Sequence, residues 1–556
     1  MRVRRLAVLS VFVLSLAVLS QTAAPAKSFT TPEVDGAVQV TGDVGAARGH
    51  VTPAMAQDPR DPQTLVVAES DAYSSRCMVH VSRNGGLTWS DATQPQPDSA
   101  WQGCGYAVTG VIADLAFAPD GTLYYAWSAF QGSTYQSRIY LARSNDLGRT
   151  WDTTALPRIG PDPSKRLFGL DAMPSIVIDR GDPSKVYVAW WSNNGSWNLP
   201  FSISGADASV WCRLVDNRIL SRPWIAASRD GGRTFGEAVD MAPGIDQCTT
   251  EPYITQAKDG AILAFFGQST RTLDAGKAPP AHLFFSVSRD QGKTFTAKPI
   301  YEQDGPADGP AATSTSDWLG APSPGVDLDT GAIYVAWENL GAGVPKILFK
   351  RSTDNGATWS EPVKVNDGDG KRDFDFVEEF PTLAVAPNGR IDVAWYDCRN
   401  DPVFKEGDRR NGFQDVYYAS STDGGKTFAK NVRVNDRAID RRFGPRRQSS
   451  IDGPLGLVST DTAAFVAWDD TRNGNESNGA EDIYFARVRY APAAEVFGGK
   501  TGSGTSPWAA AFLGAAVALA VGGLILVLAL LASRRSAPPS APAPSPAKPA
   551  SEPSVN

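Results

Sequence analysis

An eight-residue pattern that recurs six times constrains the fold of this chain more than any other feature. The pattern reads Ser-x-Asp-x-Gly-x-Thr-aromatic, with Asn in place of Asp in the first copy. Its copies begin at Ser82, Ser144, Ser228, Ser288, Ser352 and Ser421, so successive copies start 62, 84, 60, 64 and 69 residues apart. Because this spacing suits one four-stranded blade with its loops, the chain is predicted to be an all-β protein of the β-propeller class.

The fixed positions of the octapeptide predict a structural role. Asp and Asn side chains accept hydrogen bonds from backbone amides just ahead of them in a turn, and Gly supplies the positive φ that a tight hairpin requires. The final aromatic side chain packs where the next strand begins. The third residue of each copy is therefore expected to close a hairpin between two strands. These residues are Asn84, Asp146, Asp230, Asp290, Asp354 and Asp423.

Seven short apolar runs alternate with the octapeptides. They read LVVAE (65–69), LYYAW (123–127), VYVAW (186–190), ILAFF (262–266), IYVAW (333–337), IDVAW (391–395) and AFVAW (464–468). Such β-branched and aromatic runs are typical of buried strands. They predict seven blades over residues 37–490, with a six-bladed ring and one irregular segment as the alternative. The segment 38–40 resembles those that follow two octapeptides, and we expect it to complete the last blade and close the ring.

The two ends of the chain predict export and membrane anchoring. Near the N-terminus, arginines precede a short apolar run and a stretch of small residues, as in a signal peptide, although an uncleaved anchor is the alternative. Near the C-terminus, an apolar stretch is long enough to cross about 30 Å of hydrocarbon, and two arginines follow it on the expected cytoplasmic side. The predicted parts are a signal peptide (1–26), a linker (491–507), a transmembrane helix (508–532) and a Pro/Ala-rich cytoplasmic tail (533–556). The propeller is thus expected outside the cell membrane.

The cysteines and the net charge narrow the chemistry. Export permits disulfides, and the pairs nearest in sequence are Cys77–Cys104 and Cys212–Cys248, which leaves Cys398 as a structural thiol. The three histidines lack metal-ligand spacing, which argues against a histidine-rich zinc site. The formal net charge of −7 gives no basic field that would attract nucleic acid.

The six octapeptides resemble Asp-boxes (BNR repeats), which occur in sialidases and in many other propellers, and the resemblance covers most of residues 37–490. It implies a sialidase-like propeller, a retaining exo-glycosidase that acts on terminal sialic acid or a related acidic sugar. In that family three arginines hold the substrate carboxylate, a Tyr assisted by Glu is the nucleophile, and an Asp is the acid/base.

Two loops on the face opposite the octapeptides share the pattern W-x-D-x-R-N, at 395–400 and 468–473. An Asp and an Arg two positions apart on an extended segment point the same way, so each pair either faces a ligand or braces its own loop. On the sialidase resemblance, the substrate-binding residues would be Arg399, Arg472 and either Arg446 or Arg447. The nucleophile would be Tyr396, assisted by Glu378 or Glu379, and the acid/base would be Asp397 or Asp470. Glu251 stands before a proline at the matching place in blade four.

Two further segments allow two interpretations each. Asp367, Asp369 and Asp373 alternate in an acidic stretch that could bind Ca²⁺ through oxygen ligands or be a plain acidic loop, and no other cofactor is predicted. The insertion at 192–221 carries Trp197 and two further aromatic residues, and it could be a sugar-stacking lid or a structural flap.

Two functions follow from these observations. The first is a membrane-anchored glycoside hydrolase of the sialidase-like kind, favoured by the clustered arginines and carboxylates. The second is a non-catalytic propeller that binds a glycan or a protein partner at the cell surface. The absence of the Arg-Ile-Pro motif of sialidases favours the second, as does the seventh unit, because sialidases have six blades.

Overall fold

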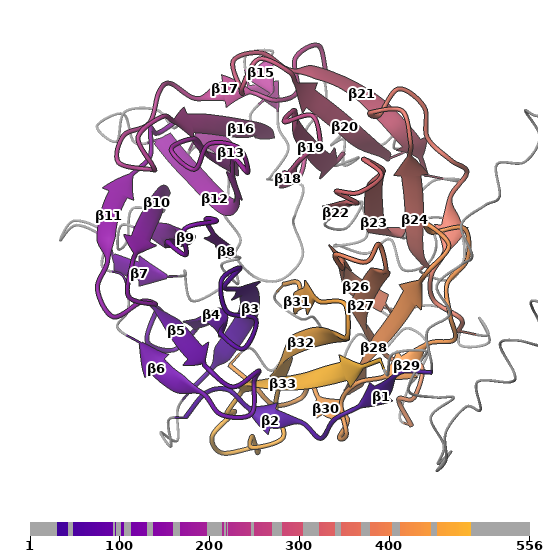
Figure 1. Ribbon diagram of the computed structural model, residues 1–556. Coiled ribbons are helices and arrows are strands. Elements are labelled where there is room, and N and C mark those ends of the chain that lie inside the picture. The colour runs from indigo at the N-terminus through magenta and orange to yellow at the C-terminus, as the bar shows by residue number, and fades with distance from the viewer. Residues whose placement is uncertain are drawn as a thin grey trace, which may run out of the picture. The chain divides into compact units, whose positions relative to one another are not determined.

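The computed structural model describes residues 31–490, except 43–47, 93–94, 96–101, 105–112, 131–136, 160–166, 197–213, 216–217, 220, 246–248, 269–280, 304–321, 340–345, 369–377, 403–411 and 446–452. In residues 31–490 seven antiparallel sheets surround a central axis, which is a seven-bladed β-propeller (Figure 1). The prediction of an all-β propeller with seven blades is confirmed.

Each blade is a sheet of four main strands, which follow one another from the axis outward. Blade 1 is β3 (His50–Gln57), β4 (Leu65–Asp71), β5 (Arg76–Ser82) and β6 (Ser90–Ala92). Blade 2 is β8 (Asp114–Phe117), β9 (Leu123–Phe130), β10 (Ser137–Ser144) and β11 (Asp152–Ala155), with β7 (Gln102–Cys104) also paired to β9. Blade 3 is β12 (Leu167–Ile178), β13 (Val186–Ser196), β16 (Ser221–Ser228) and β17 (Val239–Asp240).

The remaining blades repeat this order. Blade 4 is β18 (Tyr253–Gln256), β19 (Ile262–Gly267), β20 (His282–Ser288) and β21 (Thr296–Glu302). Blade 5 is β22 (Ser323–Val326), β23 (Ile333–Asn339), β24 (Lys346–Ser352) and β25 (Val363–Lys364). Blade 6 is β26 (Glu378–Val385), β27 (Ile391–Asp397), β28 (Phe413–Ser421) and β29 (Val432–Arg433), with β30 (Ile439–Asp440) also on β28. A separate hairpin joins β14 (Leu214–Val215) and β15 (Arg218–Ile219).

Blade 7 is closed by the N-terminal segment of the chain. Its inner strands are β31 (Gly456–Ser459), β32 (Ala463–Asp470) and β33 (Asp482–Arg489). Its outer edge is formed by β1 (Glu33–Val34) and β2 (Val38–Gln39), which both pair with β33 (Figure 1). The predicted contribution of segment 38–40 to the last blade is therefore confirmed, and the sheet edge that β33 would expose is covered.

The core of the propeller is a ring of contacts between blades. Seven clusters of buried apolar residues in the described part of the chain each join two neighbouring blades. In the cluster between blades 6 and 7, for example, Tyr418 of β28 lies with Trp468 of β32. The fifth residue of the second-strand run is a fully buried Trp in five blades, because that strand is covered by a blade on each side.

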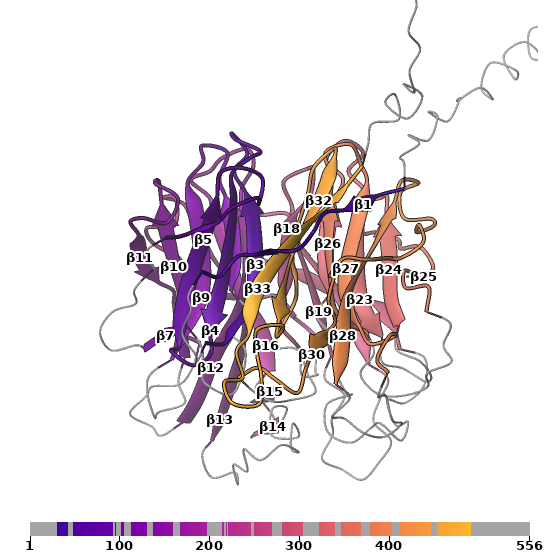
Figure 2. The ribbon, with the colours of Figure 1, turned by 90° about the horizontal axis from the view of Figure 1, so that it is seen from below.

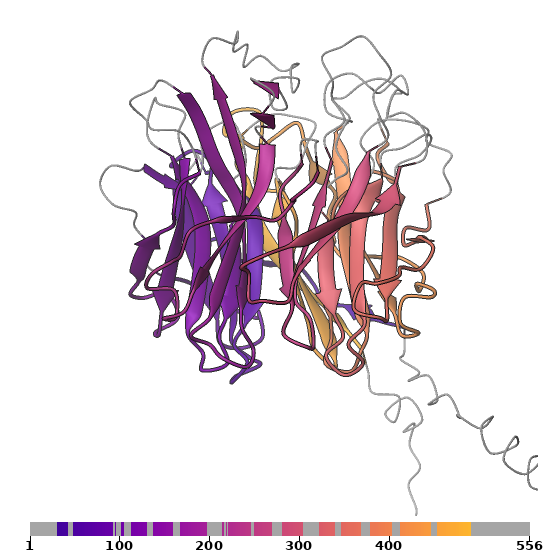
Figure 3. The same cartoon turned by 90° about the horizontal axis from the view of Figure 1, so that it is seen from above.

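The octapeptides form the turns between the third and fourth strands. In the second copy, Ser144 Oγ donates to Asp146 Oδ1 at 2.7 Å and accepts from the Gly148 amide at 2.8 Å. Asp146 Oδ1 also accepts from the Thr150 amide at 2.9 Å, while Oδ2 accepts from the Thr150 hydroxyl at 2.7 Å. These bonds fix the turn and hold the pKa of Asp146 below its usual value, at about 2. Strand order places all of these turns on one face of the propeller, opposite the ends of β12 and β13 that extend past the rim (Figures 2 and 3).

Several predictions fall on residues that the structure does not describe. The signal peptide, linker, transmembrane helix and tail lie outside the described residues, as do the aromatic side chains of the 192–221 insertion. No helix long and apolar enough to cross a membrane occurs among the described residues.

The predicted disulfides are described only in part. Cys77 is disulfide-bonded. Its expected partner, Cys104, lies in β7, where only the backbone is described. Cys212 and Cys248 lie outside the described residues, and Cys398 is a buried thiol. The two pairings stay predictions.

Candidate ligand site on the propeller axis

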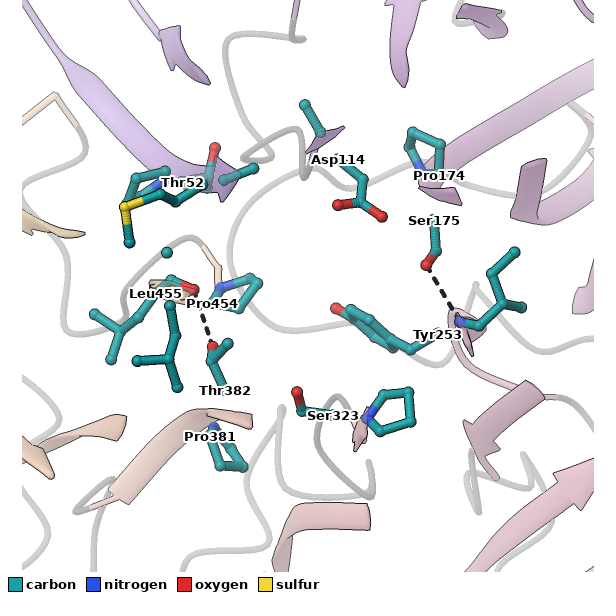
Figure 4. A pocket seen from close by; sticks show the side chains of 18 of the residues that line it. Thr52, Asp114, Pro174, Ser175, Tyr253, Ser323, Pro381, Thr382, Pro454 and Leu455 are labelled. Carbon is teal, nitrogen blue, oxygen red and sulfur yellow. Dashed lines mark hydrogen bonds between the residues drawn. The ribbon is translucent and has the colours of Figure 1, made fainter. Parts of the chain in front are cut away.

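A cavity of about 210 Å³ lies on the propeller axis (Figure 4). Residues of all seven innermost strands, or residues directly before those strands, line it. In blades 2, 4, 5 and 7 these residues stand at or directly before the start of the innermost strand, and in blades 1, 3 and 6 they stand at a bulge within it.

The seven blades contribute equivalent residues to this cavity. In each blade, one residue of the innermost strand pairs with the fourth residue of the second-strand run. These seven residues, which we call the axial ring, are Ala54, Asp114, Ser175, Tyr253, Ser323, Thr382 and Gly456. Five adjacent members carry a hydroxyl or a carboxyl group, and Thr52 and Thr255 add two further hydroxyl groups to the lining.

Four polar members of the axial ring hold neighbouring backbones. Asp114 Oδ2 accepts from the Ile176 amide at 2.8 Å, and its Oδ1 accepts from the Leu115 amide at 2.8 Å. Ser175 Oγ accepts from the Ile254 amide of the next blade at 3.2 Å. Ser323 Oγ accepts from the Leu383 amide at 2.9 Å, whereas Thr382 Oγ1 donates to the Leu455 carbonyl at 3.0 Å.

Tyr253 differs from the other polar members of the ring. Its side chain reaches into the cavity, and its hydroxyl points toward the space between Asp114 and Leu455 (Figure 4). The hydroxyl oxygen is buried and has no hydrogen-bond partner among the described residues. Burial, together with the negative charges of Glu251 and Asp114, raises the pKa of Tyr253 well above its usual value. The hydroxyl is therefore a neutral donor that is available to a ligand.

Two carboxyl groups near Tyr253 hold protons more tightly than usual. Burial raises the pKa of Asp114 from 3.8 to about 6, although the amides of Ile176 and Leu115 act in the opposite direction. Burial also raises the pKa of Glu251 from 4.5 to about 7, and its Oε2 has no hydrogen-bond partner among the described residues. Carboxyl groups with pKa values in this range are suited to general acid–base catalysis near neutral pH.

The rim of the cavity has an unusual backbone. Thr52, Met173 and Phe380 have φ values of 56°, 56° and 52°, and each precedes a proline at a bulge in an innermost strand. A left-handed conformation at non-glycine residues costs roughly 1–3 kcal/mol each and is concentrated at functional sites. Asp171 is buried next to one of these bulges, and its Oδ1 accepts a hydrogen bond from Trp190 Nε1 at 3.3 Å. Burial raises the pKa of Asp171 to about 6.

The first W-x-D-x-R-N loop is held by its own residues. Asp397 is buried and accepts from Trp395 Nε1 at 3.1 Å and from Arg399 Nη2 at 2.6 Å. Arg399 also contacts Asp367 at 2.6 Å, and its guanidinium lies 4.0 Å from the ring centroid of Tyr417. A Ca²⁺ ion at Asp367 would have to compete with this ion pair, and the other two proposed ligands, Asp369 and Asp373, lie outside the described residues.

The second loop repeats this arrangement in blade 7. Asp470 accepts from Trp468 Nε1 at 2.9 Å and from Arg472 Nη2 at 2.7 Å. Arg472 contacts Asp436 at 2.8 Å and lies 4.0 Å from the ring centroid of Tyr484. Both arginines are thus occupied by a carboxylate and an aromatic face, which favours the bracing interpretation of the two loops.

The other predicted site residues do not line the axial cavity in the described structure. Tyr396 is fully buried, its hydroxyl accepts from the Asp469 amide at 3.0 Å, and burial raises its pKa well above the usual value. Glu378 and Glu379 lie in β26 opposite Asp397 and Tyr396, and only their backbone is described. Arg446 and Arg447 lie outside the described residues. Their proposed catalytic and binding roles stay predictions.

Sequence reasoning noticed Glu251 but missed Asp114, Ser175 and Tyr253. One signal was present, because a proline stands directly before the axial-ring position in five blades. Each inner strand pairs with the apolar run that follows it, so an alignment of the seven runs would also have aligned the seven ring residues.

Comparison with known proteins gives partial likenesses. No family model matches the chain. A curated xyloglucanase from Paenibacillus sp. is 24% identical over 350 residues, which is 53% of this chain and 31% of that protein. This chain therefore matches less than a third of the length of that relative.

Solved structures with a similar fold include three proteins. A Hadza microbial sialidase has a TM-score of 0.43 and 14% identity, over 79% of this chain and 75% of its own. The α-L-arabinofuranosidase of Fusarium graminearum has a TM-score of 0.42 and 11% identity, over 82% of this chain and 98% of its own. The α-L-arabinanase of Penicillium chrysogenum has a TM-score of 0.41 and 12% identity, over 82% of this chain and 99% of its own. All are likenesses in fold, and none shows the family to which this chain belongs.

Proposed function

We propose that this chain is a glycoside hydrolase that binds the end of a glycan in the axial cavity. The observation that carries the proposal is the convergence of the Asp114 carboxyl group, with its raised pKa, and the unpartnered Tyr253 hydroxyl on one cavity. The partial match to a xyloglucanase supports a carbohydrate substrate. Because seven innermost strands wall the cavity, a chain end can enter it more readily than the middle of a polysaccharide.

In this proposal Asp114 is the proton donor. Hydrolysis of a glycosidic bond requires an acid that protonates the leaving oxygen. Below about pH 6 the Asp114 carboxyl is protonated, and after proton transfer its carboxylate is held by the amides of Ile176 and Leu115. Tyr253 would hydrogen-bond the sugar, and the negative charge that Glu251 gains above about pH 7 would weaken proton release from Tyr253.

The lining of the cavity favours a neutral sugar as the first substrate class to test. The described lining residues include no arginine or lysine, so they offer no ion pair to the carboxylate of sialic acid. Terminal sialic acid, which the Asp-box resemblance implies, is the second class. The two classes differ in charge at the same position, so a single panel of substrates distinguishes them.

The test compares hydrolysis of fluorogenic glycosides by the wild type, Asp114→Asn and Asp230→Asn. General acid catalysis contributes about 10²–10⁴-fold, so Asp114→Asn should lose at least 100-fold in kcat. Asp230→Asn is the matched control, because it makes the same change in an octapeptide turn outside the cavity lining, where the first copy naturally has Asn84. Full turnover by Asp114→Asn would contradict the assigned role.

A non-catalytic glycan-binding propeller is the second candidate function. It is favoured by the two hydrogen bonds that Asp114 accepts, one from an amide of blade 2 and one from an amide of blade 3. These bonds join the innermost strands of the two blades, which is a structural role that requires no catalysis. Binding on a glycan array without turnover of any glycoside would support this candidate over the hydrolase.

We also propose that the propeller is exported and held at the cell membrane by residues 508–532. The sequence pattern supports this location. A chain that ends at residue 500 should be released into the medium, whereas the full chain should stay with membranes after an alkaline wash. Release of both forms would contradict the anchor.

A further inference from the structure

We infer that Tyr253 sets the free width of the axial cavity and thereby selects the size of the ligand end that it admits. Six members of the axial ring are small, namely Ala54, Asp114, Ser175, Ser323, Thr382 and Gly456. Tyr253 is the only aromatic member, and its ring extends across the cavity from blade 4 (Figure 4). The identity of the ligand as a glycan rests on the proposed function, whereas the effect on width does not.

Tyr253 does not make the hydrogen bond to the next blade that Asp114 and Ser175 make. Asp114 and Ser175 each bond the amide of the residue that follows the ring member of the next blade. For Tyr253 the corresponding residue in blade 5 is Pro324, which has no amide hydrogen. Blade 5 therefore needs no acceptor from position 253, and a large side chain can occupy that position with its hydroxyl directed into the cavity.

The free space beside Tyr253 fits a small part of a ligand. Its volume of about 210 Å³ is below the roughly 300–1,000 Å³ of sites that enclose drug-sized ligands. An aromatic face offers apolar contact to the C–H groups of a sugar, and the phenol offers one hydrogen bond. Tyr253 thus presents both kinds of contact to a single terminal unit and excludes a bulkier one.

The test of width uses Tyr253→Ala, Tyr253→Phe and the control Ser323→Ala, which changes another ring member without opening comparable space. Tyr253→Ala keeps the Cβ and leaves a hole the shape of a phenol, so phenol at millimolar concentration should raise its Tm. The same compound should leave the Tm of the wild type and of Ser323→Ala unchanged. No rise in the Tm of Tyr253→Ala would refute the inference, whatever the chain hydrolyses. If Tyr253→Ala does not fold, Tyr253→Leu replaces it in the same comparison.

The test of selection compares two glycosides with the same terminal sugar, one of them branched at that unit. Tyr253→Ala should shift the ratio of kcat/KM toward the branched substrate by at least tenfold. Tyr253→Phe should keep the wild-type ratio while kcat/KM falls for both substrates, because it removes only the hydroxyl. An unchanged ratio in an active Tyr253→Ala enzyme would refute the role of Tyr253 in selection and leave the proposed hydrolase function standing.

Discussion

The closure of the ring makes a quantitative prediction at Asp482. This fully buried residue of β33 accepts from Arg48 Nε at 2.8 Å and Nη2 at 2.9 Å, and from Thr41 Oγ1 at 3.0 Å. Asn473 Nδ2 donates to it at 2.8 Å. Thr41 and Arg48 follow β2, so this carboxylate ties the N-terminal segment to the last blade. Asp482→Ala leaves the largely buried guanidinium of Arg48 without this partner, which typically costs 3–5 kcal/mol.

That loss is a large part of the roughly 5–15 kcal/mol by which domains are usually stable. Urea denaturation followed by tryptophan fluorescence should therefore show a free energy of unfolding lower by about 3–5 kcal/mol for Asp482→Ala. The control is Asp259→Ala, because Asp259 forms an exposed ion pair with Arg289 that contributes at most about 1 kcal/mol. Equal stability of the two variants would refute the account of ring closure.

Three further predictions concern stability. Burial raises the pKa values of Asp114 and Asp171 to about 6 and of Glu251 to about 7, so the folded chain binds protons more tightly than the unfolded chain. The free energy of unfolding should therefore fall as pH rises from about 5 to 7, by up to about 1.4 kcal/mol per pH unit for each of these groups, and urea midpoints that rise over this range would contradict it. Asp423→Ala should destabilise its turn by about 1 kcal/mol and Asp423→Asn by less, as measured by urea midpoints, because Asn keeps one acceptor. Reduction of the disulfide of Cys77 should lower the free energy of unfolding by about 2–4 kcal/mol, and an unchanged Tm in dithiothreitol would argue against a structural role.

The sequence was sufficient for the propeller because each blade carries a local signal. The octapeptide places Ser, Asp, Gly and Thr within one turn, and the contacts that fix the turn join residues at most four apart, as for Ser144 and Gly148. The closing strand could be recognised because segment 38–40 resembles segments in other blades. Repetition therefore made the number of blades and the joining of the two ends predictable.

The axial ring was not predictable in the same way. Asp114 and Tyr253 belong to blades 2 and 4, and their meeting depends on how whole blades are spaced around the axis. Tyr253 has no amide to bond in the next blade because the corresponding residue there is Pro324, in blade 5. Blade 2 also lacks the proline that precedes the ring position in five other blades, so no sequence pattern near Asp114 indicated its place in the ring.

The two W-x-D-x-R-N loops show why polar patterns alone are ambiguous. An Asp and an Arg on one side of an extended segment have the same spacing whether they hold a ligand or each other. In the structure, Asp397 binds Arg399, whose remaining groups contact Asp367 and the face of Tyr417. Only the contacts made by neighbouring loops distinguish the two interpretations.

The dependence of kcat/KM on pH for wild type and Asp114→Asn, measured on one hydrolysed glycoside, tests the central claim most directly. The account predicts that the wild-type value falls above an apparent pKa near 6, as the Asp114 carboxyl loses its proton. In Asp114→Asn this step should be absent and the remaining rate at least about 100-fold lower. An identical profile and rate in both proteins would show that the chemistry does not take place at the axial cavity.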